Sequence, residues 1–259
     1  MRKLILISLK NSLKLVTIYP IHTVMTFIYA LLNIVLNLVF WLVLSSNFGE
    51  IGLYGIKEIM VLNMFALLAD SLGGFFFGYR DLPYCINDGS YDKYLILPRR
   101  DIFLFLIENI PIVYMIQQFL MFVIGFCVVI FAYEISFSII NFLMAIIFLV
   151  IGVLILNLFY GSLTMLSFLI DRFEGFRELI FSLNITKNYP LTIFPKFVQI
   201  ILTYVIPMSL ISYYPTMCFF GRVDNFKFLV FELIILIVFA LLYEFIHKKA
   251  ILKYTSNGG

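Results

Sequence analysis

Two acidic side chains inside long apolar stretches, Asp70 and Glu108, have the clearest chemical potential in this sequence. A carboxyl group at membrane depth is costly, so an intramembrane acid is a candidate for function by default. The structural alternative is that Asp70 only hydrogen-bonds to a neighbouring helix, and that Glu108 pairs with Arg99 or Arg100 near the cytoplasmic surface. A proton-coupled carrier usually needs a richer relay of acids and bases than these two residues.

No recognisable catalytic constellation accompanies these acids. The only two histidines, His22 and His247, lie near opposite ends of the chain, which excludes a histidine-based zinc cluster. Cys85, Cys127 and Cys218 are scattered without the paired spacing of a disulfide framework or a metal site. The motifs of a phosphate-binding loop and of a nucleophile elbow do not occur. We therefore expect no catalytic centre, no cofactor and no metal on this chain.

The composition identifies lipid as the solvent for most of the chain. Hydrophobic residues make up 63% of the 259 residues and charged residues only 13%, whereas soluble domains have roughly 45–50% and about 25%. The 30 phenylalanines are more aromatic surface than a water-soluble chain of this size could bury. An all-α integral membrane protein is the expected fold class.

Six stretches are long and apolar enough to span a membrane as helices, which takes about 20 residues. Their continuous apolar runs exclude the alternating pattern of a β-barrel. The predicted spans are about 21–45, 58–79, 103–132, 140–169, 198–220 and 228–247. Residues 1–259 are expected to form a single transmembrane domain.

The N-terminal stretch 2–18 alternates apolar residues with Lys3, Lys10 and Lys14. This pattern is typical of an amphipathic helix that lies in the membrane interface, before a break at Pro20. The alternative is a ragged cytoplasmic extension of the first span.

Lys and Arg concentrate on one side of the predicted spans, which favours cytoplasmic N- and C-termini. With this orientation the outside retains only Lys57, Arg222 and Lys227, while Lys187 and Lys196 lie in an ambiguous stretch. The cytoplasmic side receives Arg2, Lys3, Lys10, Lys14, Arg80, Lys93, Arg99, Arg100, Arg172, Arg177, Lys248, Lys249 and Lys253.

The cytoplasmic connection 80–101 is the longest polar stretch between spans. Ser90 could cap a short helix that ends at Pro98 and shows Tyr91, Tyr94 and Leu95 on one side. Such a face is typical of a docking element for a cytoplasmic partner. The alternative is a loop that lies on lipid headgroups through its basic residues.

The stretch 178–197 is a poor uninterrupted span. It could be an interfacial helix-loop before the fifth span. Alternatively, the fifth span starts near Glu178, and Pro190, Pro195 and Pro207 break a re-entrant region. The residues leave both versions open.

The connection 80–101 also carries a family resemblance. The string Gly89-Ser-Tyr-Asp92-Lys-Tyr-Leu95-Ile-Leu-Pro98 resembles the Gly-x-Leu-Asp-x-Leu-Leu-x-x-Pro pattern between the second and third spans of type-2 ABC exporter permeases. A later series is similar to that of a branch whose permeases are often encoded in pairs beside an ATPase. It comprises Tyr189-Pro190-Leu-Thr-Ile-Phe194-Pro195, Ile206-Pro207, Tyr213-Tyr214-Pro215 and Gly221.

The resemblance implies a permease subunit that pairs with a second permease, either a copy of itself or a related chain. Two separate ATPase subunits, which hold ATP and Mg²⁺, would dock beneath the pair. The helix 2–18 would be the interfacial elbow helix, and the loop would be the coupling helix, with Tyr91 standing where Leu is common. The docking residues implied are Gly89, Tyr91, Asp92, Lys93, Tyr94, Leu95, Pro98, Arg99 and Arg100, and the gating or re-entrant prolines are Pro190, Pro195, Pro207 and Pro215.

The function expected is ATP-driven export of a hydrophobic or amphipathic compound, such as an antibiotic, a peptide or a lipid-like molecule, across a bacterial cell membrane. The lipid bilayer is a further expected partner, and no nucleic acid is expected. One alternative is a motor-free carrier or channel that uses Asp70 and Glu108. A second is the substrate-binding membrane subunit of a vitamin importer, and an intramembrane enzyme is a third.

Overall fold

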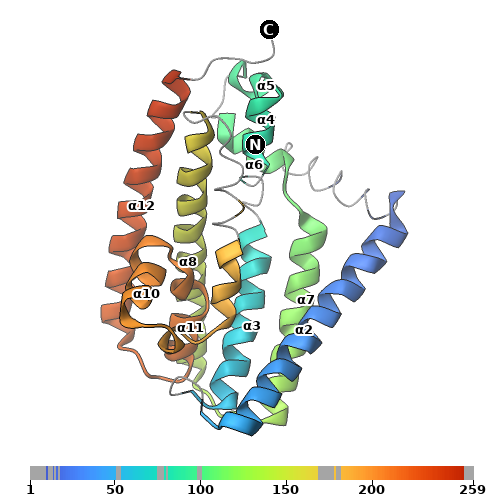
Figure 1. The fold of residues 1–259 in the computed structure, drawn as a ribbon, viewed down its shortest axis with the longest axis vertical. Helices are drawn as coiled ribbons and strands as arrows, with labels where there is room; N and C mark the ends of the chain where they lie inside the picture. Colours follow the sequence, from blue (N-terminus) through green and yellow to red (C-terminus); the bar gives the residue numbers. More distant parts are fainter. Residues whose placement is uncertain are drawn as a thin grey trace.

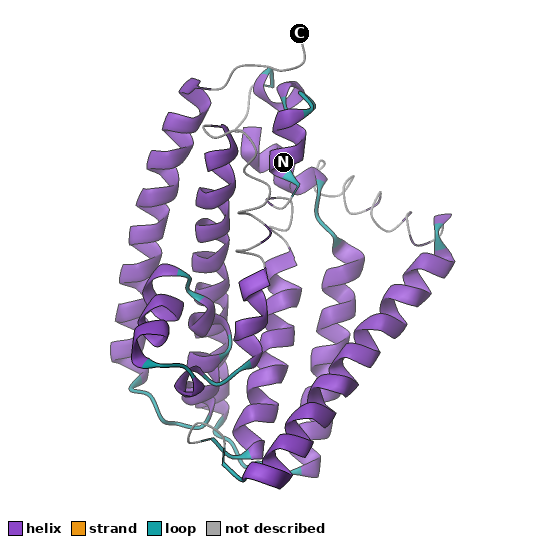
Figure 2. Ribbon diagram, in the orientation of Figure 1, coloured by secondary structure: helices purple, strands orange, loops and turns teal. Residues whose placement is uncertain are grey.

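The computed structural model describes residues 10, 14, 16, 18–50, 54–74, 79, 81–97, 101–168, 178 and 182–253. Regular structure in these residues is helical, and no β-strand occurs among them (Figure 2). The all-α prediction is therefore confirmed. Of the predicted interfacial helix 2–18, only positions 10, 14, 16 and 18 are described, so that prediction lies largely outside the described residues.

Four helices are long and apolar enough to cross a membrane, judged over the described residues. Each is one continuous, mostly apolar helix of at least 21 residues. The first begins at Pro20, a position where proline's missing N–H costs nothing. They are α2 (Pro20–Phe48), α7 (Ile112–Ala132), α8 (Ile139–Met165) and α12 (Asn225–Lys253). The predicted spans 21–45, 140–169 and 228–247 correspond to α2, α8 and α12.

Helix α3 (Ile56–Gly73) corresponds to the predicted span 58–79 but ends earlier. It lies at the centre of the molecule, and most of its side chains are buried. Its 18 residues include Lys57, Glu58 and Asp70, so it is not among the four long apolar helices. Four of the six predicted spans therefore contain a helix that is long and apolar enough to cross a membrane. The count of six stays a prediction.

The third predicted span, 103–132, is wrong as one continuous helix. It divides into α6 (Asp101–Glu108) and α7, with Asn109–Pro111 between them outside any helix. Pro111 explains the break, because proline lacks the N–H that a helix interior needs and it disfavours helical geometry at the preceding residue.

The fifth predicted span, 198–220, is not one helix, as its prolines indicate. The chain from 183 to 219 consists of short pieces separated or capped by Pro190, Pro195 and Pro207, for the same reason. In order these are η3 (Leu183–Asn188), η4 (Leu191–Ile193), α10 (Lys196–Ile200), the π-helical turn η5 (Ile201–Val205), η6 (Met208–Ile211) and α11 (Tyr213–Phe219).

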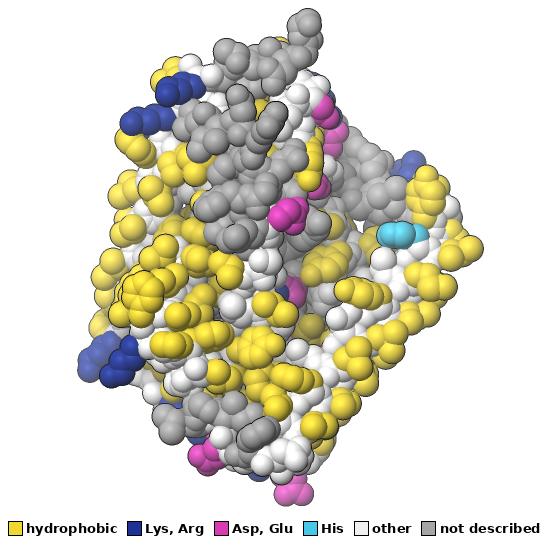
Figure 3. Space-filling model, viewed as in Figure 1, with side chains coloured by type: hydrophobic (Ala, Val, Ile, Leu, Met, Phe, Trp, Pro, Cys, Tyr) yellow, Lys and Arg dark blue, Asp and Glu magenta, His cyan; other side chains and the backbone are white. Residues whose placement is uncertain are grey.

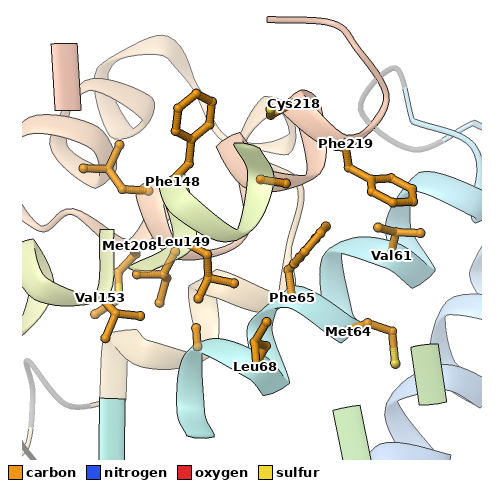
Figure 4. Packing of buried hydrophobic residues seen from close by; sticks show 14 of the residues in the cluster. Val61, Met64, Phe65, Leu68, Phe148, Leu149, Val153, Met208, Cys218 and Phe219 are labelled. Carbon is orange, nitrogen blue, oxygen red and sulfur yellow. The ribbon is translucent and has the colours of Figure 1, made fainter. Parts of the chain in front are cut away.

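This broken segment packs tightly on α8, with α12 and α3 also against α8. Phe148 and Leu149 of α8 belong to the main core together with Phe65 of α3 and Phe219 of α11 (Figure 4). The Phe65 and Phe219 rings pack edge to face with centroids 5.9 Å apart. Gly152 permits the closest approach, since a Cβ atom there would lie 2.4 Å from the Leu210 carbonyl oxygen. Small residues commonly allow such contacts between membrane helices.

Helix α2 differs from the others because it leans away from the bundle (Figure 1). Most of its apolar side chains are exposed, as Figure 3 shows along its outer face. One anchor lies near its C-terminal end, where the buried Trp41 packs edge-on against Tyr189 with ring centroids 5.4 Å apart. The start of α2, the end of α12 and two short helices, α4 (Leu82–Asn87) and α5 (Asp92–Leu95), lie at the same end of the bundle (Figure 1).

Candidate functional site

The two short helices α4 and α5 form a compact unit, residues 81–97, here called the α4–α5 unit. Gly89 makes the turn between them with φ of +75°, a left-handed conformation that favours glycine. The Tyr91 N–H donates to the Cys85 carbonyl at 2.9 Å and closes the turn. The N-cap of α5 is Tyr91 rather than the predicted Ser90, whose N–H instead bonds to Asp88 Oδ1 at 2.9 Å.

Tyr91 and Tyr94 attach this unit to the bundle. Both are buried, and their rings pack with Phe105 of α6 and Phe168 after α8 at centroid distances of 5.3–5.8 Å. These four residues are called the aromatic cluster. The Tyr91 hydroxyl also donates to Asp101 Oδ2 at 2.7 Å, and both groups are buried. The prediction that Tyr91 and Tyr94 join Leu95 on a docking face is therefore wrong, because these rings fill the core under the unit.

The aromatic cluster continues into the end of α12. His247 Nε2 lies 3.8 Å from Asp101 Oδ1, and the His247 ring stacks on Tyr243 with centroids 5.8 Å apart. The Tyr79 hydroxyl donates to the Tyr243 hydroxyl at 3.2 Å. The α4–α5 unit is thus connected through side chains to α6, α8 and α12.

The outer surface of the α4–α5 unit exposes four apolar side chains: Tyr84, Leu95, Ile96 and Leu97. Ile96 is 83% exposed. Of the other predicted docking residues, Lys93 is exposed while Gly89 and Asp92 are half-buried. Pro98, Arg99 and Arg100 lie outside the described residues.

Glu108 lies at the same end, at the last residue of α6. It accepts a hydrogen bond from Tyr94 and pairs with Lys93 at 3.2 Å. Both side chains of the Lys93–Glu108 pair are 58% exposed. Its described partners are therefore Lys93 and Tyr94, whereas Arg99 and Arg100, the partners expected from sequence, lie outside the described residues.

Asp70 lies inside the bundle and forms an ion pair with Lys187. The Lys187 side chain is only 5% exposed, and its backbone carbonyl accepts a hydrogen bond from Ser212 at 2.6 Å. The segment 183–188 therefore lies against α3 within the bundle. Sequence reasoning missed this pairing, although a lysine in a stretch of uncertain placement was the natural partner for an intramembrane acid.

A cavity of about 510 Å³ opens between α2, α3 and α7, beside Asp70. We call it the polar cavity, because carboxamide side chains from all three helices line it. Those from α2 are Asn33 and Asn37, that from α3 is Asn63, and those from α7 are Gln117 and Gln118. A cavity of this volume is in the range of sites for small organic molecules.

The predicted gating prolines lie around a different place, the broken segment. Pro190, Pro195 and Pro207 are the N-caps of η4, α10 and η6, and Pro215 is buried in the first turn of α11. The polar cavity reaches this segment only through Asn188.

Glu232 is a further intramembrane acid that sequence reasoning overlooked. Its side chain is fully buried in α12, and neither carboxyl oxygen has a hydrogen-bond partner among the described residues. The signal was available, since Glu232 lies within the predicted span 228–247 just as Asp70 lies within its span. In the described part of the chain no three His, Cys, Asp or Glu side chains gather as metal ligands would.

Comparison with known proteins gives one match. The model of a family described as "ABC-2 family transporter protein" matches residues 31–258, from within α2 to beyond the end of α12. The comparison with curated proteins and the comparison with solved structures gave no significant match.

Proposed function

The chain belongs to the ABC-2 family of transporter proteins, and on that premise we propose that it is the permease subunit of an ATP-driven transporter. The family assignment confirms the resemblance found in the sequence. A family of membrane transporters agrees with the four long apolar helices of this multi-pass protein. Because a permease is a transport subunit rather than an enzyme, we assign ATP, Mg²⁺ and hydrolysis to a separate ATPase.

The proposed topology has six crossings with both termini in the cytoplasm of a bacterial cell. Helix α3 would be the second crossing and the broken segment 183–219 the fifth. Broken backbone at membrane depth is tolerated where protein covers it. Helices α8 and α3 contact η6 and α11 of this segment, and α12 packs on Tyr204 and Tyr214. The position of the start of α2, the α4–α5 unit and the end of α12 at one end of the bundle supports an even number of crossings.

One observation carries the proposed energy coupling: the α4–α5 unit exposes apolar side chains while its aromatic side chains fix it to three membrane helices. Exposed Leu95, Ile96 and Leu97 suit a pocket on a partner protein. A force applied there would reach α6, α8 and α12 through Tyr91, Asp101 and their neighbours. We therefore propose this unit as the docking element for the ATPase.

In the proposed assembly, two permeases, identical or related, pair over two ATPases. Closure of the ATPases on ATP would shift the two docking elements and change access to a pathway between the membrane helices. For this coupling to work, the states of the ATPase must contact the docking element differently. The cargo would be a hydrophobic or amphipathic compound, and the direction would be export.

A motor-free carrier has less support. Such a carrier would need Asp70 and Glu108 to bind and release protons along a path, but Asp70 is paired with the buried Lys187. Glu108 lies at the end of the bundle, exposed and paired with Lys93. The two acids therefore belong to separate local arrangements.

The decisive experiment replaces both Ile96 and Leu97 with Asp in a tagged chain purified from its native membrane. We expect the co-purifying ATPase to fall at least tenfold, because two charges would have to be buried at the docking surface. Leu252→Asp is the matched control, since Leu252 is 86% exposed near the end of α12. Undiminished ATPase in the double variant, or none with the wild-type chain, would contradict the proposal. Charge reversal at Arg99 and Arg100 extends the test to the rest of the predicted loop.

A further inference from the structure

The polar cavity is unusual for its position, because two of the helices that line it, α2 and α7, are long apolar spans. Carboxamides are costly in a lipid environment unless their hydrogen bonds are satisfied. Polar residues within spans commonly face a bundle interior or a cavity and mark ligand pathways. Figure 3 shows the molecule hollowed between α2 and the remaining helices.

Three carboxamide groups of this cavity each donate one N–H to a backbone carbonyl. A carboxamide nitrogen carries two N–H groups, so each of these three side chains keeps a second one. Asn33 Nδ2 donates to Tyr29 O at 3.0 Å, Asn63 Nδ2 to Ile59 O at 2.8 Å, and Gln117 Nε2 to Thr26 O at 2.7 Å. The last of these bonds joins α7 to α2.

Two carboxamide oxygens of this cavity are available as acceptors. Asn37 Oδ1 of α2 and Gln118 Oε1 of α7 are buried without a hydrogen-bond partner in the part of the chain that the structure describes. Buried polar atoms in proteins are nearly always paired, so two unpaired oxygens lining one cavity need an explanation. A molecule with N–H or O–H groups in the cavity would supply the missing partners.

The cavity offers no free charge to a ligand. The only charged side chain that lines it is Asp70, among the described residues, and its partner Lys187 neutralises it. An ionised ligand at this depth would remain without a counter-charge, which is costly. The apolar lining by Ile34, Leu38 and Leu67 provides room for a hydrocarbon portion.

We propose that the polar cavity between α2, α3 and α7 binds an uncharged amphipathic molecule through its hydrogen-bond donors, with Asn37 Oδ1 and Gln118 Oε1 as acceptors. The proposal rests on the proposed function, since it identifies the cavity as a cargo site. Short hydrophobic peptides with blocked ends have this chemistry. Acyl chains of lipids have no donors and would leave both oxygens unpaired.

The test uses full-length protein in lipid nanodiscs and three fluorescent probes: dansyl-trileucine amide, its backbone N-methylated analogue, and its free carboxylate. We expect saturable binding of the amide, with at least tenfold weaker binding of the other two. Replacing Asn37 with Leu and Gln118 with Met should weaken amide binding about tenfold, because each lost hydrogen bond accounts for a few-fold to tenfold. Asn47→Leu, on an exposed part of the same helix α2, is the control and should leave binding unchanged.

Equal affinity for the three probes, unchanged affinity in the double variant, or no saturable binding would overturn the proposal. Displacement of the amide by added phospholipid from the wild-type chain and the double variant alike would identify a lipid site instead. If the double variant does not fold, Gln118→Met alone gives the same comparison. Binding is measured without ATP or ATPase, so its failure leaves the docking experiment on Ile96 and Leu97 unaffected.

Discussion

The aromatic cluster beneath the α4–α5 unit and the polar cavity beside α2 differ in how their side chains meet. In the cluster, Tyr91, Tyr94, Phe105 and Phe168 fill the interior, and the one polar atom of Tyr91 bonds to Asp101. In the cavity, carboxamides surround about 510 Å³ of open space. The aromatic cluster is therefore close-packed, whereas the polar cavity has room for a small molecule.

The two regions also differ in how deeply their ion pairs are buried. Each has a lysine–acid pair, but Lys187–Asp70 is largely buried beside the cavity whereas Lys93–Glu108 is 58% exposed on both sides at the cluster. A buried pair is destabilising to break, while an exposed pair contributes little. The cavity should therefore depend on its charges and the cluster on its packing.

Removing the central ring of the cluster should have the largest effect. We expect Tyr91→Ala to lower the free energy of unfolding by about 3–5 kcal/mol, because it leaves a void among three aromatic rings. The measurement is the thermal unfolding midpoint of the purified protein in detergent. Tyr91→Phe, which keeps the ring, should cost only about 1 kcal/mol. Equal losses in the two variants would show that the Asp101 hydrogen bond, not packing, holds the unit.

Breaking the buried pair should have a comparable or slightly smaller effect at the cavity. Lys187→Met leaves the Asp70 carboxylate without a counter-charge and should cost about 3 kcal/mol. Adding Asp70→Leu should recover most of this loss, because no uncompensated charge remains. Denaturant unfolding of the single and double variants measures both changes. A double variant less stable than the single one would contradict this role for the pair.

Breaking the exposed Lys93–Glu108 pair should have the smallest effect on stability. Glu108→Gln should change stability by less than about 1 kcal/mol, because solvent screens both charges. The wild-type unfolding midpoint should likewise respond little to added salt through this pair. A loss as large as that of Lys187→Met would mean that the two regions do not differ as described.

The long helices were predictable because their signal is local. Continuous apolar runs identify α2, α8 and α12 to within a few residues at most of their ends. Pro190, Pro195 and Pro207 indicate that the fifth span is irregular. The division of the third span at Pro111 was also readable, since proline within an apolar run favours a break. The exact sequence of short helices in 183–219 was not, because it depends on the fit of Leu210 against Gly152.

The candidate sites depend on contacts between distant residues, which the sequence does not encode locally. Lys187 and Asp70 are 117 positions apart, so only the folded chain reveals them as partners. In a helix as short as α5, the sequence pattern does not show which side faces the bundle. Tyr91 and Tyr94 face inward because their rings pack on Phe105 and Phe168. Glu232 shows the opposite case, a local signal that was present and overlooked.

The break at Asn109–Pro111 has a mechanical consequence. It divides one predicted span into α6, which belongs to the aromatic cluster, and α7, which lines the polar cavity. Bending an intact helix disrupts its ladder of backbone hydrogen bonds. Here the ladder is already interrupted, because Pro111 has no N–H and the Ile112 N–H bonds to the Ile110 carbonyl at 3.0 Å. If the α4–α5 unit docks an ATPase as proposed, this break would let α6 move relative to α7, and such a movement would change the width of the polar cavity.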